Sequence, residues 1–302
     1  MKIVDHNYTA KTETSVALGF FDGMHIGHTK VIKEAVKKGK GLTASVFTFN
    51  VRPYDVIFKT KTPQIISQEQ KNKLFEELGV KIVIKSDFKE ILDMSSEEFV
   101  LGYLKDRLRA KEVVCGFNFT FGKNKEGDIN KLKRLCKQAD INLTVVNPVI
   151  CDNNEVVSSS IIREYIKTGR IEKANYMMGR ELSFESEIVK GNQIGKKWGF
   201  PTANQVIPED RVCPKYGVYV SKVSFDDYET FAITNIGVKP TIGSLKPLIE
   251  SYMPFYKGED IYGKVVNTRV IKFLREEKKF DNAQILKKQI SSDIESFFDY
   301  IG

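Results

Sequence analysis

Short apolar runs rich in β-branched residues alternate, over residues 15–147, with stretches whose apolar positions recur every three or four residues. The apolar runs predict strands at 15–18, 42–49, 80–84, 112–115 and 143–146. The stretches of helical period predict helices at 26–36, 68–78, 95–108 and 125–137. Alternating strands and helices are typical of a parallel sheet with crossover helices, so this half predicts an α/β domain. Ligands of such a sheet bind beyond the carboxyl ends of its strands.

The pattern changes after a helical stretch at 160–178. Beyond it, strand-like runs are separated by turn residues, and they fall at 181–190, 216–223, 228–235, 248–254 and 265–273. Residues 281–298 again have helical spacing and predict a helix packed over these strands. We therefore predict a second, mostly antiparallel β domain, a barrel or sandwich with a C-terminal helix. The two domains are expected at residues 1–182 and 183–302.

Length and composition agree with two folded domains. The 302 residues are 41% hydrophobic and 28% charged, which places the chain far from the disordered class. No apolar run approaches the roughly 18 residues of a membrane-spanning helix, and Asp5, His6 and Asn7 stand where a secretory signal would be apolar. We expect a cytoplasmic protein with no membrane contact. Its four cysteines form no CxxC pair, so the sequence supports neither a disulfide framework nor a zinc knuckle.

The net positive charge of the chain indicates an anionic partner but does not identify which kind. Lys and Arg number 47 against 39 Asp and Glu, a formal net charge of +8, which suits nucleotides and phosphates as well as nucleic acid. The densest basic cluster, residues 37–40, is short and is typical of a solvated helix end. The chain also lacks the stripe of aromatic and basic residues that RNA-binding surfaces usually show. We expect no nucleic-acid partner, and a basic RNA-binding or regulatory protein stays as the alternative from another class.

The first chemical constellation covers residues 19–28, between the first predicted strand and the first predicted helix. Backbone amides and the helix dipole there point to where a phosphate chain would lie, and glycines let the backbone come close. His25 and His28 are three residues apart, which places both imidazoles on one face, where they can donate to phosphoryl oxygens. Zinc is a weaker alternative because no third ligand stands nearby. The candidate binding residues of this loop are Gly19, Phe20, Asp22 and Gly23.

The second constellation covers residues 191–204, where a glycine loop leads into a Phe-Pro turn. The loop, with Gly191, can close over phosphates, and Lys196 supplies a positive charge for them. Thr202 and Asn204 are two residues apart on an extended strand, so they share a face and offer oxygen ligands for Mg²⁺. Taken without its neighbours, the segment is a turn that enters a strand.

Three motifs resemble those of known families. The sequence GFFDGMHIGH at 19–28 is similar to the HxGH signature of nucleotidyltransferases, in the form found in the adenylyltransferase half of bacterial riboflavin kinase/FAD synthetases. Residues 158–163, SSSIIR, resemble that family's Ser-Ser-Thr-x-Ile-Arg element, and GFPTAN at 199–204 is similar to the riboflavin kinase signature. Further matching motifs follow in order, so the resemblance covers nearly the whole chain.

The resemblance implies a Rossmann-like nucleotidyltransferase domain followed by a riboflavin kinase barrel. The kinase would phosphorylate riboflavin with ATP and Mg²⁺ to give FMN, and the first domain would adenylylate FMN to FAD. Glu250 stands where the family has its catalytic carboxylate, which suits a base for an attacking hydroxyl. By the same resemblance, Arg163 would act with the two histidines on the triphosphate. Nucleotide- and flavin-binding roles are implied for Asn118, Ser159 and Ser160.

Two positions depart from the family pattern. Arg52 stands where the family usually has a histidine, and Asn118 where it has an aspartate. These segments are implied to hold the flavin and the nucleotide, so adenylyl transfer is the activity at risk. An enzyme with only one active domain is therefore the second alternative, although Arg52 can still bind phosphate.

Overall fold

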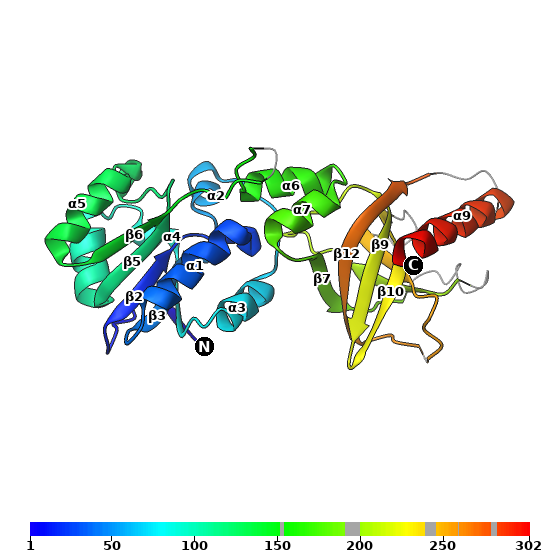
Figure 1. Ribbon diagram of the computed structural model, residues 1–302, viewed down its shortest axis with the longest axis horizontal. Coiled ribbons are helices and arrows are strands. Elements are labelled where there is room, and N and C mark those ends of the chain that lie inside the picture. Colours follow the sequence, from blue (N-terminus) through cyan, green and yellow to red (C-terminus); the bar gives the residue numbers. More distant parts are fainter. Residues whose placement is uncertain (152–153, 191–199, 239–245, 259, 279–282) are drawn as a thin grey trace. The chain divides into compact units, whose positions relative to one another are not determined.

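The computed structural model describes residues 1–151, 154–190, 200–238, 246–258, 260–278 and 283–302. Contacts within the chain divide it into two compact units, Met1–Ser158 and Ser159–Gly302 (Figure 1). The predicted binding residues Gly191 and Lys196 lie outside the described residues.

The first unit is built on a parallel sheet, as the alternating pattern predicts. Its described strands, in spatial order, are β1 (Lys2–Asp5), β4 (Ile82–Ser86), β3 (Thr43–Phe49), β2 (Thr14–Leu18), β5 (Ala110–Gly116) and β6 (Asn142–Val146). Every pair in this order runs parallel. Strand β1 was not predicted, because only Val4 of its four residues is even partly buried, and so it shows no apolar run.

The helices of the first unit follow the predicted period. Four lie where the spacing predicts them: α1 (Ile26–Lys38), α3 (Gln68–Glu77), the π-helix η2 (Glu98–Arg107) and α5 (Ile129–Ala139). Four short ones were not predicted: η1 (Asp22–Met24), α2 (Pro53–Phe58), α4 (Phe88–Ile91) and η3 (Lys123–Lys125). Segments of three to six residues are too short to show a helical period. Helices η2 and α5 bury their apolar faces against β2 and β5 in one cluster that includes Val16, Leu104 and Leu132.

The second unit begins with two helices and continues as an antiparallel sheet. The predicted helical stretch at 160–178 is split into α6 (Ser159–Lys167) and α7 (Ile171–Met178), because Gly169 between them adopts a φ of 78°. The described strands, in spatial order, are β7 (Leu182–Glu187), β12 (Val265–Glu276), β9 (Gly217–Phe225), β10 (Tyr228–Val238), β11 (Pro247–Tyr252) and β8 (Thr202–Val206). Val189, just beyond β7, bridges Asn204 on β8, so the sheet curls toward closure. The predicted C-terminal helix is α9 (Ala283–Ile301).

Helix α7 packs on β7 and β12, which groups it with the barrel. A division by contacts therefore falls after Ser158, whereas residue 182 was expected to end the first functional domain. The limits 1–182 and 183–302 stay a prediction about which residues serve which activity.

The inside of the second sheet holds a buried polar cluster that we expect to matter for stability. Gln205 on β8 is 1% exposed, and its Nε2 donates to the carbonyl oxygen of Val266 at 2.7 Å. Its Oε1 accepts from Thr268 Oγ1 at 2.6 Å. Both partners are buried. Removal of the Gln205 amide would therefore leave the Val266 carbonyl and the Thr268 hydroxyl without this hydrogen-bond partner and without access to water.

Gln205→Leu is therefore expected to lower the free energy of unfolding of the second unit by about 1–3 kcal/mol. Denaturant unfolding of the full chain measures this. The matched control is Gln138→Leu, at an exposed position on α5, which we expect to leave the unfolding transition in place. A Gln205→Leu protein as stable as the parent would show that the cluster contributes nothing.

Candidate active sites

The loop that follows β2 has a tightly constrained backbone. Phe21 adopts a left-handed φ of 57° and Met24 a φ of 41°, conformations that bulky residues rarely take. Both side chains are 1% exposed, so core packing holds the loop in this form. Gly23 has a φ of 73°, and a Cβ there would lie 2.7 Å from Ile65 Cδ1. The glycine is thus required by conformation and by space.

Asp22 joins this loop to the segment before α3. Its side chain is 5% exposed, and Oδ1 accepts from the backbone N–H of Ile65 at 3.1 Å. The candidate residue Gly19 donates its N–H to the carbonyl of Phe47 on β3 at 3.2 Å. The loop is therefore attached both to the sheet and to the chain leading into α3.

The structure brings His25 and His28 together at the start of α1. Their ring centroids are 3.5 Å apart, and the ring planes are 19° from parallel. The rings of Phe21 and His28 are nearly perpendicular, with their centroids 5.4 Å apart. His25 is the N-cap residue, and its Nδ1 accepts from the backbone N–H of His28 at 3.2 Å. Since Nδ1 accepts, the proton of a neutral His25 lies on Nε2, which is then a hydrogen-bond donor. The two imidazoles thus lie at the N-terminus of α1, beyond the carboxyl end of β2, where they can donate hydrogen bonds to an anionic ligand.

The two positions that depart from the family pattern have different surroundings. Asn118, beyond β5, is exposed. Arg52 precedes α2, and its Nη1 donates to Thr62 Oγ1 at 3.3 Å. Thr62 in turn donates to the carboxylate of Asp55, which also interacts electrostatically with Arg52. Burial raises the pKa of Asp55, but hydrogen bonds from Thr62 and Thr60 outweigh it, so the pKa lies below the usual value. The Asp55 carboxylate thus offsets the positive charge of Arg52 locally.

Ser159, Ser160 and Arg163 lie on the first turns of α6, in the second unit. The Arg163 side chain is 7% exposed, and its Nη1 donates to the carbonyl of Ser159 at 3.1 Å. This bond orients the guanidinium along the start of the helix. Its approach to the two histidines stays a prediction.

The second constellation is assembled on neighbouring strands. In the register, Glu250 on β11 lies opposite Asn204 on β8 and opposite Asn235 on β10. Directly opposite residues of an antiparallel sheet project to the same face, so these three side chains are neighbours. Thr202 lies on the same face two residues from Asn204, as its spacing predicts. Sequence reasoning did not single out Asn235 as a site residue, although it begins NIGVKPT at 235–241, one of the further motifs that match the resembled family in order.

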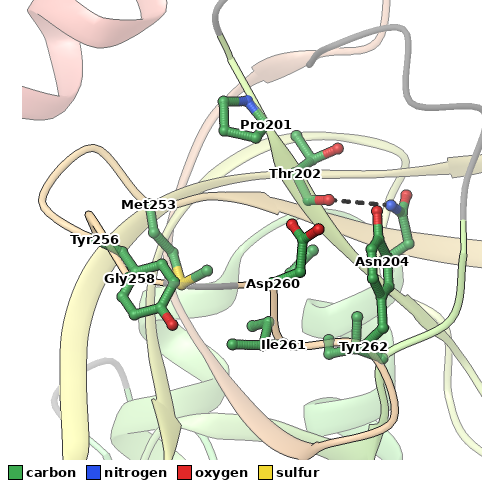
Figure 2. A pocket seen from close by; sticks show the side chains of 11 residues that line it. Pro201, Thr202, Asn204, Met253, Tyr256, Gly258, Asp260, Ile261 and Tyr262 are labelled. Carbon is green, nitrogen blue, oxygen red and sulfur yellow. Dashed lines mark hydrogen bonds between the residues drawn. The ribbon is translucent and has the colours of Figure 1, made fainter.

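A cavity of about 110 Å³ opens beside β8. Thr202 and Asn204 line it, together with Met253, Tyr256 and Ile261 (Figure 2). Asn204 Nδ2 donates to the carbonyl of Thr202 at 3.2 Å, which fixes the amide and leaves Oδ1 as its acceptor atom. Glu250 is not among the residues that line this cavity, so its nearness to it rests on the strand register.

Asp260 and Tyr262 are cavity residues that sequence reasoning missed. Figure 2 shows the Asp260 carboxylate pointing to the side of the cavity where Thr202 and Asn204 lie. The signal in the sequence was IYGK at 261–264, another of the further motifs that match the resembled family; it contains Tyr262 and directly follows Asp260. A carboxylate beside two neutral oxygen donors makes this wall suitable for a hard cation.

The described residues contain no group of three His, Cys, Asp or Glu side chains that could hold a metal ion. Within the same part of the chain, no helix is both long and apolar enough to cross a membrane.

The first unit has a parallel sheet with two histidines at the start of α1, and the second has an antiparallel barrel with hydroxyl, amide and carboxylate groups in register. Family models over both parts of the chain identify a two-domain transferase. The model of the FAD synthetase family matches residues 7–161, and that of the riboflavin kinase family matches residues 178–301. The chain belongs to the family of bifunctional riboflavin kinase/FMN adenylyltransferases.

Similar proteins agree over the full length. The Bacillus subtilis bifunctional riboflavin kinase/FMN adenylyltransferase is 31% identical, covering 97% of this chain and 94% of its own. The protein of the same description from Listeria monocytogenes is 33% identical over 92% of this chain and 89% of its own. A crystal structure from Streptococcus pneumoniae, described as a macrolide-efflux protein, has a TM-score of 0.87 at 27% identity and 98% coverage of both chains. The family assignment favours two activities over the one-domain alternative.

Proposed function

We propose that the second unit phosphorylates riboflavin with ATP and that the loop and histidines of the first unit, with Arg163, adenylylate the FMN produced. The two units hold separate groups of candidate residues, and this supports the proposal. The stacked histidines lie in the first unit. Thr202, Asn204 and Glu250 lie on paired strands of the second. Riboflavin, FMN and ATP are the proposed substrates, and Mg²⁺ the proposed metal.

In the kinase step, Glu250 takes the proton of the ribityl hydroxyl as that oxygen bonds to the γ-phosphorus of ATP. The bond from the γ-phosphorus to the bridging oxygen breaks, and ADP leaves with its electron pair. The cavity beside Thr202 and Asn204 is the proposed place for the phosphates, next to the register position of Glu250.

The donors of that cavity fit Mg²⁺. Thr202 offers a hydroxyl, and Asn204 is held so that Oδ1 is its acceptor atom; both are hard oxygen ligands. Thr202 and Asn204 would hold Mg²⁺, which would supply positive charge to the phosphates when bound. Lys196 and Gly191 are proposed to approach the same phosphates from the glycine loop.

In the adenylyl step, a phosphate oxygen of FMN attacks the α-phosphorus of ATP, and the bond to the leaving pyrophosphate breaks. His25, His28 and Arg163 donate hydrogen bonds to the oxygens on which charge develops. The amides from Gly19 to Gly23 receive the phosphate chain at the start of α1, with Phe20 and Asp22 shaping the loop. Asn118, Ser159 and Ser160 are proposed to contact the nucleotide or flavin.

The test is to incubate purified chain with ATP, Mg²⁺ and either riboflavin or FMN, and to separate the flavins chromatographically. FMN and FAD from riboflavin, and FAD from FMN, are expected. FMN without FAD would limit the chain to the kinase, and FAD from FMN alone would limit it to adenylyl transfer. No product in either incubation would refute the proposal. The cytoplasmic location and the absence of a nucleic-acid partner stay predictions.

A further inference from the structure

Lys71 on α3 is a buried cation to which the proposed mechanism gives no part. Its side chain is 2% exposed, although a lysine at this depth carries a large desolvation cost. Its Nζ donates to the carbonyl oxygen of Phe20 at 3.2 Å and lies 4.7 Å from the centroid of the Phe20 ring. The one ammonium group therefore contacts both the backbone and the side chain of the residue before Phe21.

The Phe20 carbonyl is held from two directions. Thr48 Oγ1 on β3 also donates to it, at 3.1 Å. The next residue, Phe21, has the left-handed φ of 57°, so the carbonyl is fixed where the backbone departs from ordinary conformations. Rotation of this peptide would move the amides of Asp22 and Gly23, which lie between it and His25.

The charges around Lys71 come from several elements. Burial lowers its pKa to about 8, Asp22 on η1 opposes the shift, and Lys85 on β4 adds to it. The pKa of Lys85 is itself lowered, chiefly by burial, with Glu69 on α3 opposing. The Lys71 ammonium is thus attracted by a carboxylate of the loop and repelled by an ammonium group of β4.

We propose that Lys71 is a positioning residue for adenylyl transfer: its ammonium holds the Phe20 carbonyl and so fixes residues 19–24 in the form that receives the ATP phosphates. This rests on the proposed function of that loop. A side chain that only filled the space would not need a charge. The uncharged side chain of methionine occupies a similar volume, and its burial does not carry the cost of desolvating an ammonium group. The bond that a methionine lacks is the directed one to Phe20.

The test compares Lys71→Met with Lys73→Met, an exposed lysine of the same helix, in the full chain. We expect Lys71→Met to lower kcat/KM for FMN adenylylation by about 10- to 100-fold, because small misplacements at a reacting centre have effects of that order. Riboflavin phosphorylation in the same preparation should stay within about twofold, since that site is in the other unit. Lys73→Met should alter neither activity.

A pH profile separates positioning from packing. In the parent, adenylylation should fall as Lys71 loses its proton near pH 8, because a neutral amine is a weaker hydrogen-bond donor to the Phe20 carbonyl than an ammonium group. Lys71→Arg stays charged at all these pH values, so it should restore activity and lack this alkaline decline. An unchanged decline in Lys71→Met, adenylylation within twofold of the parent, or an equal loss of both activities would each overturn the proposal.

Hydrogen exchange tests the same inference independently of activity. Amides of residues 19–24 should exchange faster in Lys71→Met than in Lys73→Met, whether or not the parent makes FAD. Unchanged exchange would overturn the role of Lys71, whereas a parent that makes no FAD from FMN would refute the proposed function instead. The two failures are therefore distinguishable.

Discussion

Glu250→Gln is expected to lower formation of FMN from riboflavin by orders of magnitude while FAD formation from supplied FMN continues. Glutamine has nearly the same shape as glutamate but cannot take the proton of the attacking hydroxyl. General-base catalysis typically contributes about 100- to 10,000-fold, so kcat of the kinase should fall by that order with little change in KM. Separate assays with riboflavin and with FMN, each with ATP and Mg²⁺, measure the two activities.

The matched control is Glu185→Gln, an exposed glutamate on β7 of the same sheet, which should leave both activities unchanged. An unfolded second unit would also lose kinase activity, so the unfolding midpoint of each variant is measured alongside. A folded Glu250→Gln protein with parental kinase activity would remove Glu250 from the mechanism. Asp260 would then be the next carboxylate to replace, since it lines the cavity with Thr202 and Asn204.

The sequence pattern predicted most elements of the fold because buried positions recur with helical spacing in the helices and form apolar runs in the strands. Strand β2 buries all of its residues, and β3 buries all but its two ends, so both stand out as apolar runs. Strand β1 is at the sheet edge and shows no such run, and α2 spans too few residues for a period to show. Gly169 lies inside a continuous helical period, so the break between α6 and α7 depended on a backbone angle that the pattern does not contain.

The candidate sites were predictable where the chemistry is local in sequence. His25 and His28, or Thr202 and Asn204, are close along the chain, so helical or strand geometry places them together. Lys71 could not be found in this way, because a lysine on a helix normally faces solvent and its partner Phe20 is 51 residues distant. Likewise, Asn235 becomes a neighbour of Glu250 only through the pairing of β10 with β11.

His28→Ala is expected to reduce FAD formation from FMN by about 100- to 1,000-fold, the usual effect of removing one donor to a developing oxyanion. Of the two histidines, His28 gives the cleaner test. His25 caps α1 through its Nδ1, so its replacement would also remove a helix cap worth about 1 kcal/mol. His28 contributes only its backbone N–H to that bond, which alanine retains.

The third histidine of the chain supplies the control. His6 lies in the same unit, 2.6 Å from Glu90 and against the Tyr103 ring, so His6→Gln should leave FAD formation near the parental rate. Kinase activity should be unchanged in both variants, because the proposed kinase residues all lie in the second unit. If folded His28→Ala protein made FAD as fast as His6→Gln, the stacked pair would have no role in the chemistry. Charge stabilisation would then have to come from Arg163 and the loop amides.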